Sequence, residues 1–260
     1  MSKNKTTDEI RAHKEKSLKI FSNYLDNLVE SDPKKADLLS YWIHTYTNYL
    51  EFEESFNPKR NKNYERGDII RVNLGFNVGS EHGGRHYAVV LDNKNNHSSP
   101  VLTIIPLSSS DGIDVHPSSV YLGDDIYQKI SAKIKGLRQA YSVEMRELAE
   151  LQSSVQALLN ADNVSENQIA TAQANKALLA TKAESLNQKQ KDLAKVQNEI
   201  NKMKIGSVAL VGQITTISKI RIEDPINIHG ALNGIKLSSA NLDLIDEKIK
   251  TLFLYNRKKD

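Results

Sequence analysis

One long stretch without glycine or proline constrains the fold of this chain more than any other feature. Neither residue occurs between Leu137 and Ile205. Apolar side chains recur there at alternating three- and four-residue spacing, which places them on one face of a helix. From Ile130 to Leu158 these side chains follow the a and d positions of a heptad, with Glu144 as the one polar member.

A polar segment divides this stretch into two helices. Residues 160–163 (Asn-Ala-Asp-Asn) interrupt the pattern, and residues 165–168 (Ser-Glu-Asn-Gln) form a capping box that begins the next helix. We expect two antiparallel helices that form a coiled-coil hairpin, bury their own seam and extend roughly 50 Å. The second helix continues a similar register at Ile169, Ala172, Leu179, Ala183, Leu186, Leu193, Ile200 and Met203, interrupted by Lys176 and Gln190.

Short β-branched segments lie on both sides of the hairpin, and further helices lie towards the two ends. A helical pair is expected over residues 7–56, with Asp32-Pro33 at the start of its second helix. A final helix begins at Ser238 or Ser239. The fold class is therefore α+β, a small β fold interrupted by the hairpin. The expected strands, bounded by Gly, Asn, Ser or Pro, are 69–74, 87–91, 101–107, 207–211 and 213–217.

Composition excludes several classes of function. The 260 residues include no cysteine, which excludes disulfides, cysteine–zinc sites and thiol catalysis. No apolar run approaches the roughly 18–20 residues of a membrane helix, and the polar N-terminus is not a signal peptide. We expect a cytoplasmic protein with no membrane partner. Net charge is +3 with no strongly basic segment, so composition alone does not suggest a nucleic-acid partner.

The histidines do not form a metal motif. Only His82 and His86 are close in sequence, and Gly83-Gly84 between them argues against the rigid helix that such ligands use. The glycines of residues 79–84 match neither a P-loop nor a dinucleotide fingerprint. We therefore expect no metal and no cofactor.

Four motifs, in order along the chain, resemble the MazF/PemK family of toxin ribonucleases. Residues 66–74 with 79–91 are similar to the opening of that family, 99–108 to its third strand, and 206–219 to its later hairpin. The resemblance covers about 64–122 and 206–255. It implies an SH3-like β-barrel with a C-terminal helix. The domains would be a helical N-terminal extension at 1–63, a barrel at 64–123 and 206–260, and a coiled-coil hairpin insertion at 124–205.

The resemblance also implies an activity and partners. The family's members are toxin endoribonucleases of toxin–antitoxin systems, usually homodimers, each held inactive by a cognate antitoxin. They cleave single-stranded RNA, here mRNA, without a metal. The ribose 2′-OH attacks the adjacent phosphate and leaves a 2′,3′-cyclic phosphate and a 5′-OH. That chemistry needs a base, an acid and donors for the phosphate oxygens.

The residues that would carry this chemistry follow from the family's pattern. An arginine before a proline ends the family's first loop, and a threonine closes its third strand. Aligned without gaps, the arginine position holds His86, the proline position Tyr87 and the threonine position Ser108. The arginine is displaced by one residue, to Arg85. The resemblance thus implies Arg85, His86 and Ser108 as catalytic residues. Because a strand reverses side-chain direction at each residue, Arg85 and His86 are not expected to point inward together. The implied RNA-binding residues are Ser80, Glu81, His82, Gln213 and Lys219.

Other departures from the family leave alternatives open. Some relatives carry an arginine and an acid in the later strand, where this chain has Leu210 and Gly212, and Thr215 replaces a common arginine. The catalytic set is therefore thinner than usual. The alternative is a catalytically inactive barrel that acts as an RNA- or protein-binding or assembly module through its coiled coil. A third interpretation makes the coiled coil the main feature, in a protein chiefly of interaction.

Overall fold

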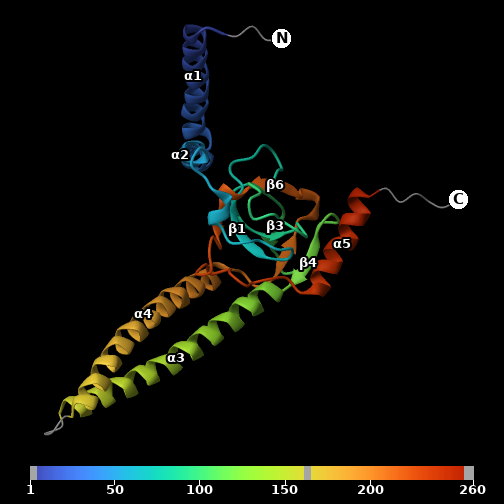
Figure 1. Ribbon diagram of the computed structural model, residues 1–260. Coiled ribbons are helices and arrows are strands. Elements are labelled where there is room, and N and C mark those ends of the chain that lie inside the picture. Colours follow the sequence, from blue (N-terminus) through green and yellow to red (C-terminus); the bar gives the residue numbers. More distant parts are fainter. Residues whose placement is uncertain (1–4, 161–164, 255–260) are drawn as a thin grey trace. The chain divides into compact units, whose positions relative to one another are not determined.

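The computed structural model describes residues 5–160 and 165–254 and divides into two compact units. The smaller unit contains the chain up to Phe56 together with Leu74–Gly84, and the larger unit contains Asn57–Asn73 and the chain from Arg85 onward. Figure 1 shows the elements of each unit in sequence colours. Among the described residues, no helix has the length and apolar character needed to cross a membrane.

The smaller unit is a helical pair, as the sequence predicts. Helices α1 (Thr7–Ser31) and α2 (Pro33–Glu53) meet at Asp32, whose side chain accepts a hydrogen bond from the Lys35 backbone N–H at 3.1 Å. Leu28, Ala36 and Leu39 are buried between the helices. Much of the apolar face expected on α1 is exposed. Leu18, for example, retains 58% of its accessible surface.

The loop between the first two strands closes on this helical pair. Phe76 packs against the cluster that contains Leu39 and Trp42. Gly75 has a φ of +87°, and a Cβ at this position would lie 2.5 Å from the Trp42 ring. Only glycine combines this left-handed backbone with such a close approach to an aromatic ring.

The larger unit contains a seven-stranded antiparallel sheet in the order β4-β5-β3-β2-β1-β7, with β6 paired to β3. The predicted α+β class, an antiparallel sheet with additional helices, is confirmed. Strands β4 and β7 were not expected as separate elements. The strands are β1 (Ile69–Asn73), β2 (Arg85–Val90), β3 (Val101–Ser109), β4 (Val120–Gly123), β5 (Ser207–Ala209), β6 (Thr215–Ser218) and β7 (Ile222–Asp224), with short 3₁₀ turns at Pro58–Arg60, Val211–Gln213 and Lys219–Arg221.

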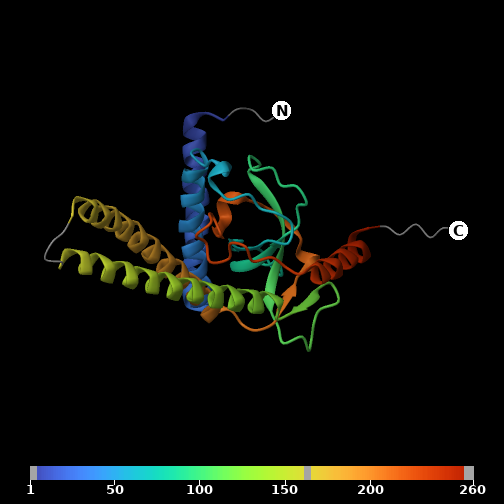
Figure 2. The ribbon, with the colours of Figure 1, turned by 60° about the horizontal axis from the view of Figure 1, so that its bottom comes forward.

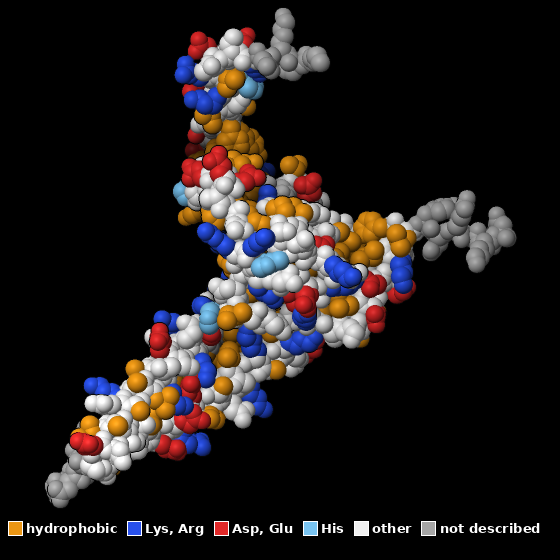
Figure 3. All heavy atoms as spheres, in the orientation of Figure 1, with side chains coloured by type: hydrophobic (Ala, Val, Ile, Leu, Met, Phe, Trp, Pro, Cys, Tyr) orange, Lys and Arg blue, Asp and Glu red, His pale blue; other side chains and the backbone are white. Residues whose placement is uncertain are grey.

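An antiparallel helical hairpin separates β4 from β5. It consists of α3 (Asp125–Leu159) and α4 (Glu166–Lys202), and the predicted capping box at Ser165 begins α4. The interruption that was expected at 160–163 lies mostly outside the described residues. Figure 3 shows basic and acidic side chains interspersed along the hairpin.

The seam of the hairpin follows the predicted register on α3, and on α4 it does so at most of the predicted positions. On α3 the half-buried positions between Tyr141 and Leu158 are the expected heptad positions. The two predicted members that are exposed are Ile169 and Ala183, and Lys182 and Lys189, which were not predicted in the seam, face the partner helix. These lysines pair across the hairpin with Glu147 and Glu144, on either side of the buried seam residue Leu186.

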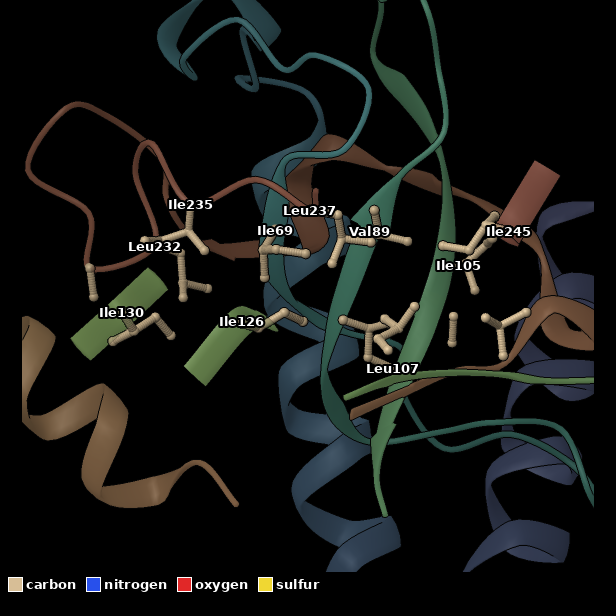
Figure 4. Close-up of a cluster of buried hydrophobic side chains, with 14 of the residues drawn as sticks. Ile69, Val89, Ile105, Leu107, Ile126, Ile130, Leu232, Ile235, Leu237 and Ile245 are labelled. Atoms are coloured by element: carbon tan, nitrogen blue, oxygen red, sulfur yellow. The ribbon is translucent and has the colours of Figure 1, made fainter. Parts of the chain in front are cut away.

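The first turns of α3 belong to the core of the barrel. Figure 4 shows Ile126 and Ile130 in one cluster with Leu232 and Ile235. Val196 on α4 is buried in the same cluster. The hairpin therefore buries more than its own seam, because its base contributes side chains to this core on the far side of residue 124. The cluster also contains Ile69, Val89, Ile105, Leu107, Ile134 and Ile245.

Polar contacts join the same base to the segment after β7. The Lys133 ammonium donates to the carbonyl oxygens of Ala231 and Asn233, at 2.8 and 2.7 Å, and to that of Gly230 at 3.3 Å. Figure 2 shows α3 beside this segment of the barrel. Burial lowers the pKa of Lys133, and nearby carboxylates oppose that shift.

The final helix, α5 (Ser239–Phe253), begins at the predicted position. The Ser238 side chain caps it by accepting from the Asn241 backbone N–H. Ile245 is fully buried, and Leu242 and Ile249 pack against the same core. Leu252, expected on the inner face, is exposed.

Candidate active site

A cavity of about 450 Å³ opens where the first two strands, the end of β3 and the end of α4 meet. It brings together all three residues proposed as catalytic, Arg85, His86 and Ser108. All of its lining residues belong to the larger unit. They are Arg71, Arg85, His86, Tyr87, Leu107, Ser108, Ser109, Glu199, Lys202, Met203, Lys204, Gly206, Ser207 and Glu223.

Strand register explains why several polar side chains meet here. β1 and β2 pair so that Arg71 lies opposite Tyr87 and Asn73 lies opposite Arg85. Because side chains alternate along a strand, these four residues share one face of the hairpin. His86 falls on the alternate face, opposite the buried Val72, yet it also borders the cavity. Alternation therefore does not keep either Arg85 or His86 away from the site.

The end of α4 brings a buried carboxylate to this face. Glu199 retains only 5% of its side-chain exposure. It accepts a hydrogen bond from the Tyr87 hydroxyl at 2.7 Å and forms an ion pair with Arg71. A buried carboxylate is costly unless it is paired and hydrogen-bonded, and both conditions are met here.

A second carboxylate joins the two arginines. Glu223, on β7, accepts from Nε of Arg71 at 3.2 Å and lies 2.8 Å from Nε of Arg85. Arg85 is 68% exposed, so most of its guanidinium faces solvent. The site thus has a buried part around Glu199 and an open part around Arg85.

Two groups of the buried part, Tyr87 and Arg71, have raised pKa values. Burial, reinforced by the hydrogen bond to Glu199, raises the pKa of Tyr87 above its ordinary value. This hydroxyl therefore stays protonated and donates at neutral pH. Burial works against the charge of Arg71, but its bonds to Glu199 and Glu223 outweigh this effect and raise the pKa of the guanidinium.

The connection from α4 into β5 passes along the rim of the cavity. Gly206 has a φ of +87°, and a Cβ at this position would lie 2.1 Å from the Ser110 carbonyl oxygen. Only glycine fits such a position without displacing the backbone. Ser207 then pairs with Ser109, and Val208 with Ser108, so the turn at Gly206 holds the serine-rich wall in place.

The five residues proposed to bind RNA differ in their positions. Ser80, Glu81 and His82 lie in the loop that groups with α1 and α2, and their RNA-binding role stays a prediction. Gln213 lies in a 3₁₀ turn, half-buried, and is not among the lining residues of the cavity. Its role also stays a prediction.

Lys219 was wrongly assigned to RNA binding. Its side chain is fully buried, and its ammonium donates to the Asn96 carbonyl oxygen at 3.1 Å and lies 5.9 Å from the centre of the Tyr64 ring. Burial lowers its pKa. A residue enclosed in this way cannot reach a phosphate from solvent, so its role is structural.

Sequence reasoning missed Arg71, Tyr87, Glu199 and Glu223. A usable pattern was present for Arg71 alone, because a charged residue between the apolar residues Ile70 and Val72 of a predicted strand points to the face opposite theirs. No local pattern marks the glutamates, which reach the cavity only through the packing of α4 and β7. Among residues 5–160 and 165–254, no three His, Cys, Asp or Glu side chains are placed to hold a metal ion.

Comparison with known families supports the resemblance found in the sequence. Residues 65–161 match the model of a family described as PemK-like, MazF-like toxin of type II toxin–antitoxin system. The matched segment runs from β1 through α3 and covers less than half of the chain. No match was found among curated proteins.

Proposed function

We propose that this chain is the toxin endoribonuclease of a toxin–antitoxin system, cleaving single-stranded RNA at the cavity of the larger unit. The observation that carries this proposal is the meeting of Arg85, His86 and Ser108 in one cavity, beside Arg71. Arg71 lies on β1, and Arg85 and His86 lie on β2, which pairs with it. All four residues lie inside the segment matched by the toxin family.

The residues of the cavity suit a metal-independent reaction. Attack by the ribose 2′-OH on the adjacent phosphate needs two proton-transfer groups, and His86 is the residue type that serves either role near neutral pH. Glu223 supplies the second group, since its side chain is more open to the cavity than that of Glu199. Products would be a 2′,3′-cyclic phosphate and a 5′-OH.

The remaining groups stabilise charge on the phosphate. Arg85 offers exposed guanidinium donors, which bind two phosphate oxygens at once. Arg71 adds permanent positive charge from the buried side, and the Ser108 hydroxyl is available as a neutral donor. Such donors act most strongly on the charge that develops in the transition state.

The proposal extends to partners. A type II toxin implies an antitoxin protein that holds it inactive, and the substrate would be mRNA. The family resemblance further supports a homodimer that acts in the cytoplasm. The hairpin would be an insertion that serves docking or spacing, and the N-terminal helices an extension.

One observation favours the alternative of a catalytically inactive module. Both arginines of the cavity are already engaged by carboxylates, Arg71 by Glu199 and Glu223, and Arg85 by Glu223. A site whose cations are satisfied internally can persist as part of a scaffold. In that case RNA or protein would bind without being cut.

Cleavage of a 5′-labelled single-stranded RNA in the presence of EDTA tests the proposal. We expect fragments that end in a cyclic phosphate, and His86→Ala should lower the single-turnover rate by about 100-fold or more. His44→Ala is the matched control, because His44 is exposed on α2. No cleavage by the wild type, and no growth arrest when it is expressed in cells, would favour the inactive module.

A further inference from the structure

Some of the charged residues that line the cavity form ion pairs with one another, and others do not. Arg71 and Arg85 carry two positive charges, and Glu199 and Glu223, which pair with them, carry two negative charges. These four charges cancel. Any net positive charge of the cavity therefore comes from the other lining residues.

Two lysines at the end of the hairpin supply that charge. Lys202 is the last residue of α4, and Lys204 follows in the connection to β5. Both are exposed and both line the cavity. Within the described part of the chain, neither forms an ion pair with a carboxylate.

Position in the helix explains only one of them. A cation in the last turn of a helix is favoured by the helix dipole, which accounts for Lys202. Lys204 lies two residues beyond the helix end, outside the last turn on which this effect mainly acts. A second exposed cation beside the first points to an anion that both would hold.

We propose that Lys202 and Lys204 form a phosphate-binding subsite for single-stranded RNA, which the inserted hairpin adds to the barrel. The inference rests on the proposed function for its choice of ligand. The two ammonium groups bind the phosphate backbone of nucleotides next to the cleaved bond, while Arg85 and Ser108 act at the bond itself. Lysine suits this task because its compact charge contacts phosphate without selecting a base.

The location argues for RNA rather than an acidic protein segment. The lysines lie on the wall of the cavity that also holds Arg85, His86 and Ser108, so a chain of phosphates that enters the cavity passes them. The subsite also gives the hairpin a role at the barrel that does not depend on its far end.

Salt-dependent binding of an uncleavable RNA tests the subsite. The probe is a fully 2′-O-methylated nine-nucleotide RNA, which lacks the attacking hydroxyl. For single strands the logarithm of the affinity falls with the logarithm of salt concentration by about 0.7 per phosphate contact. Loss of two contacts in a Lys202→Ala/Lys204→Ala variant should flatten the slope by about 1.4 and weaken binding about 25-fold at 0.1 M salt, converging with the wild type near 1 M.

The matched control is Lys176→Ala/Lys191→Ala, which removes the same charge from exposed positions on α4 away from the cavity. It should retain the wild-type slope. An equal slope change in both double variants, or none in the first, would overturn the subsite. So would a Lys202→Ala/Lys204→Ala variant that binds the RNA normally but loses binding to poly-glutamate, because the surface would then serve a protein. Since this probe cannot be cleaved, a failure of catalysis in a separate assay would count against the proposed function alone.

Discussion

Removal of the whole hairpin should unfold the barrel. In a variant that replaces residues 124–204 by a short Gly/Ser linker, the core loses Ile126, Ile130, Ile134 and Val196, each at most 6% exposed. Full burial of such a side chain contributes about 1.5–3 kcal/mol, so the four together contribute about 6–12 kcal/mol. That is comparable to the roughly 5–15 kcal/mol that stabilises a typical domain.

A shorter deletion should be tolerated and serves as the control. Glu147 on α3 and Lys182 on α4 form an ion pair at 2.6 Å, so a short Gly/Ser loop can join them and remove residues 148–181. We expect this variant to unfold cooperatively in urea, with a midpoint close to that of the full chain. Cooperative unfolding of the 124–204 deletion with undiminished free energy would show that the base of the hairpin is not part of the core.

Three further predictions concern single residues of the larger unit. Ile130→Ala should lower the free energy of unfolding, measured by urea titration, by about 2–5 kcal/mol. The control Ile169→Ala, at a position that is 47% exposed, should change it by no more than about 0.5 kcal/mol. Similar losses in the two variants would contradict the assigned core. Lys219→Met should reduce thermal stability by about 1–3 kcal/mol through the unpaired Asn96 carbonyl and leave RNA affinity unchanged; the reverse pattern would restore Lys219 as an RNA contact. Burial acts to raise the pKa of Asp125, but hydrogen bonds from the Ser238 backbone and from Lys129 outweigh it and hold that pKa below its ordinary value. The ionised carboxylate therefore stabilises the fold above about pH 3.9, and this contribution is lost as the pH falls through the lower folded-state pKa. Asp125→Asn should accordingly be less stable than the wild type at pH 7, with a difference that shrinks below about pH 4, and a constant difference down to pH 3 would refute the assignment.

Helices were predictable from the sequence because their periodicity and caps are local. The Ser165 capping box and the Asp32-Pro33 start are each encoded within four residues, and both are present in the structure. The α4 seam was predicted less well. The predicted apolar position Leu186 is buried, but the contacts of Lys182 and Lys189 were not predicted, because they reach across to glutamates whose positions depend on how α3 packs.

The residues of the candidate site show the same difference between local sequence signals and contacts that depend on packing. Arg85, His86 and Ser108 lie at strand ends that a family motif marks, and the structure brings them together. Glu199 is one of several acidic residues on a charged helix, and nothing nearby in the sequence distinguishes it. Lys219 follows a strand and would ordinarily be solvated, but the loop that contains Asn96 covers it.

The order of strands in the sheet has a consequence for synthesis of the protein. β1 pairs with β7, so Arg71 lies beside Asp224 although the two are far apart in the chain. A ribosome adds about 5–20 residues per second. Ser108 therefore emerges roughly 6–23 s before Glu223, the last of the residues that line the cavity. During that interval the nascent chain displays Arg71, Arg85 and His86 without the later wall of the cavity. The cavity, and with it the site of the proposed activity, is complete only at the end of this interval.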